Sequence, residues 1–354
     1  MHLLAGGYYG FQNLGDELLL NSLLQRIRSI APEAEVRILS SHPGQTESLH
    51  GIRGIQRWNP IALVQAIRKA DGLIFGGGGI FQDLTSSLSL EYYLSWIRLA
   101  HFFKKPVLLW GIGVGPILRP ANSKKTAQLL RTIRHITVRD FPSRDRLLQW
   151  GVPSPVTVSA DPVLGLKLSS TPPATQPSEV GIVLRRLPKT SDFQKLLSMA
   201  RFLSQRFNAP IHWISFGPSD EHWGRRLAQR TQSPLTPFRL ERWEECLSVL
   251  AQLKILFTLR YHGAILAWKT GVPSLPLRAD PRLLAWFEEL HPALHWPKSL
   301  PGPQDIWGTE ALRQILEGPL LQMPGKDRTQ ALAERERQNE TILADFLDSL
   351  HRVK

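Results

Sequence analysis

Hydrophobic and polar positions alternate in a regular way along the first half of the chain. Short apolar runs, which predict buried strands, are separated by segments whose apolar residues recur at helical spacing. The predicted strands are 3–5, 36–39, 73–75, 107–110, 136–138 and 156–158, and the predicted helices are 17–30, 61–69, 90–103 and 143–150. Strands that alternate with helices predict a parallel sheet covered by helices on both faces.

This alternation stops at residues 168–178, which are polar, proline-rich and without periodicity, as in a linker. It then restarts, with predicted strands at 180–184, 211–214 and 255–258 and predicted helices at 193–207, 243–253 and 264–269. The tail from residue 326 is charged and helical, and its apolar stripe predicts packing across a domain. We therefore predict two doubly wound, Rossmann-like domains (1–167 and 179–325), the linker 168–178 and a C-terminal helix (326–354).

The composition narrows the class of protein. A hydrophobic content of 42% and a charged content of 21% are typical of a globular protein in water. The single cysteine, Cys246, cannot form an internal disulfide, which fits a reducing cytosol. The first residues do not resemble a signal peptide, and no apolar stretch reaches membrane-spanning length. We expect a soluble, cytoplasmic protein.

The net charge of +13 favours an acidic partner, such as nucleic acid, an anionic membrane surface or a phosphate-bearing substrate. The basic residues are scattered along the chain, and no RNA-recognition, zinc-finger or helix-turn-helix signature is present. We therefore expect no nucleic-acid partner. A solvated basic surface explains most of the charge, and peripheral association with the inner face of the membrane stays open.

Three glycine clusters, 6–10, 76–79 and 111–115, follow predicted strands. Ligands bind at the carboxyl ends of strands in open α/β sheets, and glycine lets the backbone approach them closely. None of the clusters is a dinucleotide or Walker fingerprint, and no metal-ligand spacing or serine-hydrolase elbow occurs. The clusters predict a ligand-lined sheet edge, with no metal and no nucleotide.

Arg260 and His262 lie two residues apart, where the predicted strand 255–258 meets the next helix. A guanidinium, an imidazole and a helix N-terminus together favour an anionic ligand. The alternative for either residue alone is structural: an arginine that caps a strand and a histidine in the core. Asp16, Glu17 and Asp83 are the carboxylates nearest the glycine clusters, where they would bind or deprotonate hydroxyl groups. Asp16 would equally serve as a helix cap.

Taken together, these segments resemble the polysaccharide pyruvyl transferase family, in particular its CsaB-type bacterial members. The matching segments occur in the family's order from residue 6 to about residue 290. They are 6–17, 76–83 with Tyr92 and Tyr93 downstream, 111–116, 138–140, 160–162 and 259–262.

The resemblance implies a fold like that of the two-domain GT-B glycosyltransferases, with the active site in the interdomain cleft. It implies phosphoenolpyruvate as the donor and no cofactor. The product is a ketal in which pyruvate bridges two hydroxyls of one sugar, in a cell-surface polysaccharide or its lipid-linked precursor, and phosphate is released.

Carried across by position, the resemblance also assigns roles to residues. The donor site would contain Arg139, Arg260, Arg282, Gly77, Gly78 and Gly113. His262 would act as the general acid or protonate the leaving phosphate. Asp16 or Glu17 would orient or deprotonate the acceptor, which Asn13, Asp16 and Asp83 would contact. The family's Asp-Pro-Lys segment reads Asp280-Pro281-Arg282 here, which keeps the charge but changes the donor geometry. The N-terminal domain would thus hold the acceptor and part of the donor site.

Two other functions fit parts of the pattern. A nucleotide-sugar glycosyltransferase of GT-B type would show the same alternation of strands and helices, and it would bind UDP more tightly than phosphoenolpyruvate. A non-catalytic protein that binds anionic glycans or membrane surfaces would use the net charge of +13, but it has no need of an Arg-x-His pair.

Overall fold

The computed structural model describes residues 1–84, 86–153, 155–167, 177–186, 189–237, 243–292, 305–317 and 325–352. The chain divides into two compact units. The first unit comprises Met1–Phe11, Asp16–Lys167 and Gln330–Lys354, and the second comprises Gln12–Gly15 and Leu168–Thr329. Within the predicted linker, residues 168–176 lie outside the described part of the chain.

The first unit is built on a seven-stranded sheet in which every pair of neighbouring strands is parallel. The strand order is β3-β2-β1-β4-β5-β6-β7. The strands are β1 (His2–Gly6), β2 (Glu35–Ser40), β3 (Gly54–Gln56), β4 (Gly72–Phe81), β5 (Val107–Val114), β6 (His135–Val138) and β7 (Val156–Val158). All six apolar runs predicted in this half are strands, and only the three-residue β3 was not predicted.

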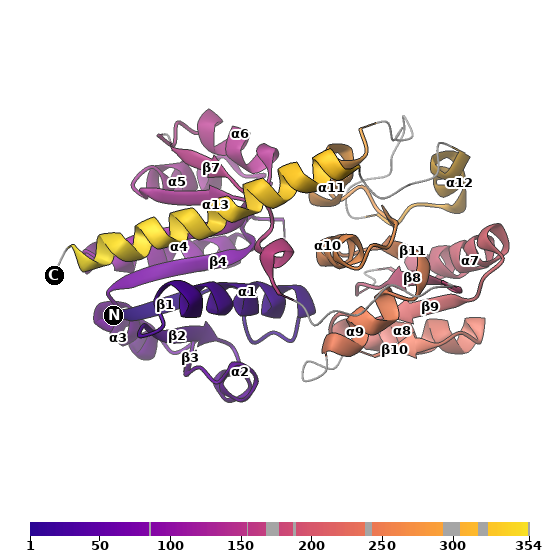
Figure 1. Cartoon of the computed structure of the whole chain (residues 1–354), viewed down its shortest axis with the longest axis horizontal. Helices are drawn as coiled ribbons and strands as arrows, with labels where there is room; N and C mark the ends of the chain where they lie inside the picture. The colour runs from indigo at the N-terminus through magenta and orange to yellow at the C-terminus, as the bar shows by residue number, and fades with distance from the viewer. Residues whose placement is uncertain are drawn as a thin grey trace. The chain divides into compact units, whose positions relative to one another are not determined.

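Helices cover both faces of this sheet (Figure 1). One face is covered by α1 (Leu14–Ile30) and α13 (Lys326–His351), and the other by α3 (Pro60–Lys69), α4 (Ser87–Phe102), α5 (Pro120–Leu130) and α6 (Phe141–Gln149). Successive residues of a strand point to opposite faces, so Leu3 lies in the core with α1 whereas Leu4 lies in the core with α3 and α4. The short α2 (Pro43–His50) contacts β3, and a 3-10 turn, η1 (Pro162–Gly165), follows β7.

The C-terminal helix α13 is part of the first unit's core. Its apolar stripe contributes Leu343, Phe346, Leu347 and Leu350 to the core that it shares with α1 and β1. The buried Asn339 fixes the position of the helix, because its amide donates to the Ala160 carbonyl (2.9 Å) and accepts from the Thr137 hydroxyl (2.9 Å). The C-terminal helix therefore packs across a sheet that is formed by the N-terminal half of the chain.

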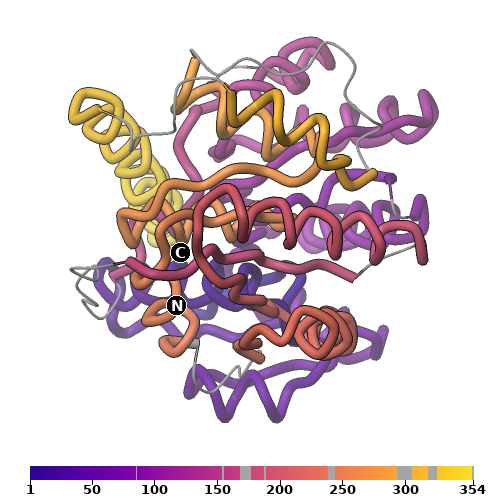
Figure 2. The backbone as a smooth tube through the Cα atoms, turned by 90° about the vertical axis from the view of Figure 1, so that its right-hand side faces the viewer, coloured from indigo at the N-terminus to yellow at the C-terminus, as the bar shows by residue number. Residues whose placement is uncertain are grey.

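The second unit contains a five-stranded parallel sheet of order β10-β9-β8-β11-β12. Its strands are β8 (Glu179–Val183), β9 (Ile211–Ile214), β10 (Leu235–Thr236), β11 (Leu253–Thr258) and β12 (Ser274–Pro276). One core contains residues of α7 (Thr190–Phe207), α8 (Pro218–Thr231) and α12 (Thr309–Glu317). The helices α9 (Trp243–Leu250) and α10 (Tyr261–Lys269) pack against β11, and α11 (Pro281–Leu290) packs against β12. The backbone can be followed through these elements in Figure 2.

Two of the three glycine clusters lie inside strands, which corrects the prediction that they follow them. β4 continues through the four glycines to Phe81, and β5 continues to Val114. Gly77 (φ +79°), Gly78 (φ +82°) and Gly111 (φ +58°) adopt left-handed backbone conformations that other residues avoid. The pairing of β4 with β5 is irregular between Gly78 and Phe81. Glycine thus lets these strands bend without ending.

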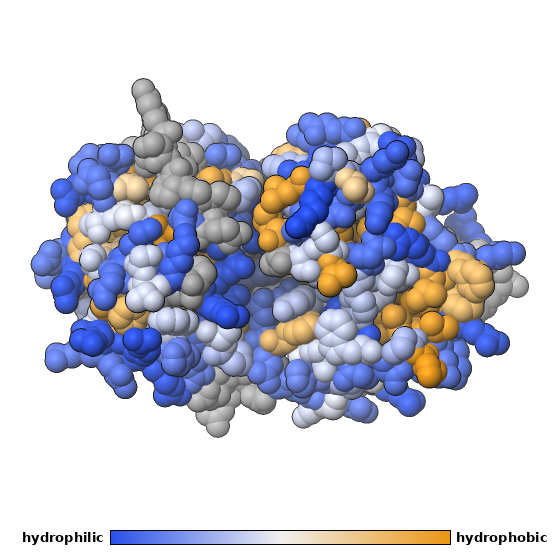
Figure 3. Space-filling model, turned by 180° about the vertical axis from the view of Figure 1, so that it is seen from behind, coloured by the Kyte–Doolittle hydropathy of each residue, from blue (hydrophilic) through white to orange (hydrophobic). Residues whose placement is uncertain are grey.

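Both units are doubly wound, as the alternating pattern predicted. The strand order reverses between β1 and β4 in the first unit and between β8 and β11 in the second. In such sheets, ligands bind beyond the carboxyl ends of the strands at these reversal points. The molecular face in Figure 3 is mostly hydrophilic, with separate hydrophobic patches. Among the described residues, no helix has the length and apolar character that crossing a bilayer requires.

Candidate anion-binding site

The second unit gathers arginines at the carboxyl ends of its strands. Each lies just beyond a strand or in the first turn of the next helix, and two buried carboxylates lie among them. The arginines are Arg185 after β8, Arg260 after β11, Arg278 after β12 and Arg282 in α11, and the carboxylates are Asp220 and Asp280. Four positive charges against two negative ones leave an excess of two positive charges. We call this set the arginine cluster.

Asp220 holds Arg260 in a single orientation. The guanidinium donates from Nε (2.8 Å) and Nη2 (2.7 Å) to the two carboxylate oxygens of Asp220, and Nε also reaches the Leu184 carbonyl (3.0 Å). Asp220 lies in the first turn of α8 and is fully buried. Such a bidentate pair restricts both the position and the plane of the guanidinium. Arg260 is therefore a fixed cation at the point where the strand order reverses.

Asp280 organises the other side of the cluster. Asp280 is the N-cap of α11 and accepts a hydrogen bond from the Arg282 backbone N–H (3.0 Å). Its carboxylate oxygens also accept from the guanidinium of Arg282, at Nε (3.0 Å) and Nη2 (2.7 Å), and from Nη2 of Arg278. Burial by itself would raise the pKa of Asp280, but the hydrogen bonds and charges of Arg282 and Arg278 outweigh burial and hold that pKa well below its usual range. Asp280 is thus ionised at neutral pH.

Arg185 is the least compensated member of the cluster. Burial, followed by the positive charges of Arg278, Arg260 and Arg282, lowers its pKa to about 9, and Asp280 only partly opposes this shift. Arg185 is still protonated at pH 7. A cation that its surroundings disfavour is stabilised when an anion binds beside it. The electrostatics of the cluster therefore favour an anionic ligand.

His262 lies beside the cluster, at the second position of α10. Its ring faces Gly15, where the imidazole Cγ lies 2.5 Å from the position that a Cβ atom would take. The segment 12–15 is held by a hydrogen bond from the Leu14 N–H to the Phe216 carbonyl (3.0 Å). Because Asn13 lies in this segment, the second unit contains four of the predicted site residues: Asn13, Arg260, His262 and Arg282.

Arg139 belongs to the first unit, unlike Arg260 and Arg282. It is buried after β6 and forms ion pairs with Asp161 (Nη1–Oδ2, 3.2 Å) and Asp140 (Nε–Oδ2, 3.4 Å). The guanidinium packs on Gly113, where a Cβ atom would lie 2.9 Å from Nε. Gly113 thus leaves room for Arg139, and Arg139 balances the charge of the fully buried Asp161.

The first unit also brings Asp16 to the second glycine cluster. An oxygen of Asp16 lies 3.5 Å from the position that a Cβ atom would take on Gly78, and Leu19 fills the space beside Gly77. The neighbouring Glu17 is buried, accepts from the Gly10 N–H (2.9 Å) and pairs with His50 (3.2 Å). Glu17 therefore supports the first glycine loop, whereas Asp16 is the more accessible of these two carboxylates.

Asp83 forms hydrogen bonds within the first unit. Its buried carboxylate accepts from the backbone N–H groups of Leu118 (2.6 Å) and Arg119 (3.1 Å) and from the Asn122 amide (2.8 Å). Burial would raise the pKa of Asp83, but these hydrogen bonds lower it below its ordinary value. Both oxygens hold the segment 118–122, and the contact of Asp83 with an acceptor stays a prediction.

Aromatic rings surround a buried cation beside the first glycine loop. Arg57 donates to the Gly7 carbonyl (2.7 Å) and the Tyr93 hydroxyl (3.1 Å). Its guanidinium carbon lies 5.0–5.3 Å from the ring centres of Phe11, Trp58, Tyr92, Tyr93 and Trp96. The Tyr8 ring stacks on Phe11 (centroids 4.0 Å apart), and Tyr8 and Trp58 are 43% and 56% exposed. We call Tyr8, Phe11, Trp58 and Tyr92 the aromatic platform.

Several of these residues were missed from the sequence. Arg185 directly follows the predicted strand 180–184, so its place at a strand end was a usable signal. Arg278 follows β12, a three-residue strand that contains a proline and has no clear pattern. Neither Asp220 nor Trp58 has a local signal, because their partners are distant in sequence.

The fold and the site define a two-domain α/β protein of the GT-B-like class with a cationic sheet edge. The chain belongs to the polysaccharide pyruvyl transferase family, whose model matches residues 13–281. No curated protein sequence matches the chain. Within the described ranges, no group of three or more histidine, cysteine or acidic side chains is arranged to hold a metal ion.

Solved structures of low sequence identity share this fold. The UDP-N-acetylglucosamine 2-epimerase from Rickettsia bellii is 12% identical, with a TM-score of 0.62 over 99% of this chain and 98% of that one. The Methanocaldococcus jannaschii UDP-GlcNAc 2-epimerase in complex with UDP-GlcNAc and UDP is 11% identical, with a TM-score of 0.59 over 97% of this chain and 99% of that one. At this identity the likeness shows the fold alone, and it confirms the predicted GT-B-like architecture.

Proposed function

We propose that this chain, as a CsaB-type member of its family, transfers the pyruvyl group of phosphoenolpyruvate to a sugar. The sugar belongs to a cell-surface polysaccharide or its lipid-linked precursor, the product is a ketal, and the reaction takes place in the cytoplasm. Family membership supports a transferase that acts on a glycan. The observation that carries the choice of donor is the arginine cluster beside His262, with its excess of two positive charges.

The charges of the donor match the cluster. Phosphoenolpyruvate carries a carboxylate and a phosphate, and both are bound well by the paired N–H donors of guanidinium groups. Arg260 and Arg282 are held in place by carboxylates, so they bind an anion with little loss of side-chain entropy. A bound anion would stabilise the charged form of Arg185 most, because it offsets the repulsion from the neighbouring arginines. For Arg139, Gly77, Gly78 and Gly113, which belong to the first unit, a donor role rests on the family resemblance alone.

The reaction requires proton transfer at two stages. The methylene carbon of phosphoenolpyruvate gains a proton and becomes a methyl group, while one sugar hydroxyl forms a bond to the central carbon. A second hydroxyl then forms the other C–O bond as the bond to phosphate breaks. Of the two hydroxyl protons, one balances the new methyl group and the other leaves with phosphate. We assign the acid role to His262. Asp16 would orient or deprotonate the acceptor hydroxyls, and Glu17 would support the first glycine loop.

The acceptor is proposed to bind on the aromatic platform. The C–H faces of a sugar ring are apolar, and they pack on exposed aromatic faces whose π-electrons attract the slightly positive hydrogens. Arg57 keeps three of these rings, those of Phe11, Trp58 and Tyr92, in fixed positions through close contacts. A rigid platform of this kind binds with a smaller entropy loss than mobile side chains would.

Thermal unfolding tests the donor assignment. A ligand that binds only the folded state raises the melting temperature, so we expect a rise with phosphoenolpyruvate and none with UDP. Arg185→Gln should abolish the rise, because it removes one cation of the cluster. Arg186→Gln is the matched control, since Arg186 is the exposed neighbour with the same charge. A rise with UDP and none with phosphoenolpyruvate would overturn the proposal in favour of a nucleotide-sugar enzyme.

A turnover assay tests the acid role of His262. Phosphate release from phosphoenolpyruvate is measured with cell-surface polysaccharide as acceptor, and the product is examined by mass spectrometry for the added ketal. We expect His262→Gln to lower the rate by roughly 10²–10⁴-fold while the rise in melting temperature with phosphoenolpyruvate persists. A variant that turns over at the wild-type rate contradicts the role assigned to His262.

A further inference from the structure

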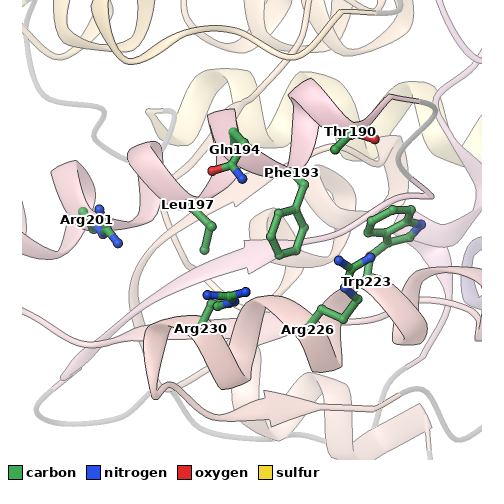
Figure 4. A pocket seen from close by; sticks show the side chains of 8 residues that line it. All are labelled: Thr190, Phe193, Gln194, Leu197, Arg201, Trp223, Arg226 and Arg230. Atoms are coloured by element: carbon green, nitrogen blue, oxygen red, sulfur yellow. The ribbon is translucent and has the colours of Figure 1, made fainter.

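A groove lies between α7 and α8, on residues that the proposed function does not use. It has a volume of about 440 Å³ and is lined by Thr190, Phe193, Gln194, Leu197, Arg201, Trp223, Arg226 and Arg230. Figure 4 shows that side chains of the two helices point toward one another across it. The volume falls within the range of ordinary small-molecule sites. We call it the α7–α8 groove.

The lining combines three arginines with no carboxylate. Among the described residues, Arg201, Arg226 and Arg230 have neither an ion pair nor a hydrogen-bond partner. By contrast, the neighbouring Arg225 on α8 pairs with Glu221. Like charges that share a groove repel one another and destabilise the free protein. The positive charge of the groove is therefore left uncompensated, whereas the adjacent arginine on the same helix is neutralised.

Aromatic rings hold one of these arginines in place. The Arg226 guanidinium carbon lies 5.0 Å from the Phe193 ring centre and 5.2 Å from that of Trp223. Cation–π contacts with two rings fix the cation while its N–H donors stay available. Arg230 lies one helical turn further along α8, a rise of about 6 Å. Two guanidinium groups at this spacing suit the oxygens of one or two phosphate groups.

The rest of the lining combines the apolar Phe193, Leu197 and Trp223 with the polar Thr190 and Gln194. Phe193 and Leu197 project from α7 into the groove between the arginines (Figure 4). Phe193 is only 6% exposed, whereas Leu197 and Trp223 are partly exposed. A bare inorganic anion would leave Leu197 and Trp223 uncovered, and a ligand with an apolar body next to its phosphate would cover them. We propose that the α7–α8 groove binds a phosphate-bearing ligand whose apolar part packs on Leu197 and Trp223. The source of the phosphate is either the head group of an anionic lipid or a free phosphorylated molecule.

Binding is measured by isothermal titration calorimetry on the full-length protein with two soluble probes, inorganic diphosphate and dihexanoyl phosphatidic acid. We expect both to bind, and the lipid to bind more tightly because of its apolar part. Arg226→Gln and Arg230→Gln should each weaken binding by about tenfold or more, because each removes charge-assisted hydrogen bonds. Arg230→Gln avoids the ring contacts of Arg226, so a folding defect in one variant leaves the other informative.

Arg225→Gln is the matched control, because it removes the same charge from the same helix outside the groove. It should bind both probes as the wild type does. Arg185→Gln reports on the separate arginine cluster and should likewise retain binding of dihexanoyl phosphatidic acid. The proposal is overturned by absence of binding, by equal losses in Arg225→Gln and Arg230→Gln, or by loss in Arg185→Gln alone. These outcomes are independent of any effect of phosphoenolpyruvate.

A vesicle experiment distinguishes a lipid head group from a free phosphorylated molecule as the source of the phosphate. Sedimentation is compared between vesicles of phosphatidylcholine alone and vesicles with equal parts phosphatidylcholine and phosphatidylglycerol. Retention on the anionic vesicles that is lost in Arg230→Gln and kept in Arg225→Gln assigns the groove to a lipid head group. Binding of the soluble probes without vesicle retention assigns it to a free phosphorylated ligand.

Discussion

The imidazole of His262 occupies the space that a side chain on Gly15 would need. Its Cγ atom lies 2.5 Å from the position that a Cβ atom would take on Gly15, and its Nδ1 atom lies nearer still. Real Cβ atoms do not approach other heavy atoms this closely. Gly15 is therefore required at this position because of where His262 lies, and the two residues form a single steric unit 247 positions apart in the sequence (262 minus 15).

Gly15→Ala tests this relationship. The new methyl group must displace the imidazole, and a shift of about 1 Å in a catalytic group reduces turnover by roughly 10²-fold. Overpacking typically costs about 1–3 kcal/mol, and the preference of the helix for alanine over glycine, about 0.5–1 kcal/mol, offsets only part of it. We expect a large fall in kcat with a modest fall in the melting temperature. Turnover at the wild-type rate would mean that His262 has no part in the chemistry.

Gly44→Ala is the control for this substitution. Gly44 is also the second residue of a helix, α2, but nothing lies within 4 Å of the position that its Cβ atom would take. The substitution is chemically the same and has a similar helical position without the steric conflict. We expect unchanged kcat and a slight gain in stability, measured by thermal unfolding.

Arg185→Gln should stabilise the protein without ligand. Because the pKa of Arg185 is lowered in the folded state to about 9, well below its ordinary value, folding disfavours the charged form. The unfolded chain binds this proton more tightly, so the associated stability is at its lowest below pH 9 and rises as the pH increases above 9. We expect a higher melting temperature for the variant at pH 7 and a difference from the wild type that shrinks above pH 9. A lower melting temperature of the variant at pH 7 would contradict the view that the neighbouring arginines repel Arg185.

Much of the fold could be predicted because the apolar runs are strong. Buried parallel strands such as 107–110 are continuous apolar runs, and the helices between them have clear periodicity. β10, with two residues, and β12, with a proline, carry too little pattern to be recognised. The glycines of β4 were predicted to follow the strand because glycine usually interrupts strands, but their left-handed conformations let the strand continue.

The site was less predictable because it depends on contacts between distant residues. Arg260 and His262 could be predicted, since they share one strand-to-helix junction. The pairing of Arg260 with Asp220, 40 positions earlier, depends on how α8 packs against β9. The use of Asp83 by the segment 118–122 depends in the same way on a distant partner. Residue type and local position therefore indicated which side chains carry charge, and tertiary packing decided which of those charges are already neutralised.

Arg139→Gln should destabilise the first unit. Removing one partner of a buried ion pair costs about 3–5 kcal/mol, since it leaves the other charge uncompensated, and the Asp161 carboxylate is fully buried. Urea unfolding of the variant measures this loss. Adding Asp161→Asn should recover part of the stability, because the buried negative charge is removed while the side-chain oxygen that accepts from the Val163 N–H is kept.

The double variant also separates structural from catalytic roles of Arg139. If Arg139 holds the donor as proposed, the double variant regains stability but still transfers no pyruvyl group. If turnover returns together with stability, Arg139 acts only through the fold, and it leaves the proposed donor site.

Gly77→Ala should be more damaging than an alanine at another left-handed glycine of the same unit. Gly77 has φ +79°, and Leu19 lies 2.7 Å from the position that its Cβ atom would take, whereas Gly51 has φ +63° with nothing within 4 Å. A left-handed backbone costs a non-glycine residue about 1–2 kcal/mol, and that penalty is common to both substitutions. Only Gly77→Ala adds overpacking against Leu19, typically about 1–3 kcal/mol. Urea unfolding should therefore show a larger loss for Gly77→Ala. Equal losses would mean that Leu19 moves aside without penalty. Glycine would then be required at position 77 by its left-handed backbone conformation alone.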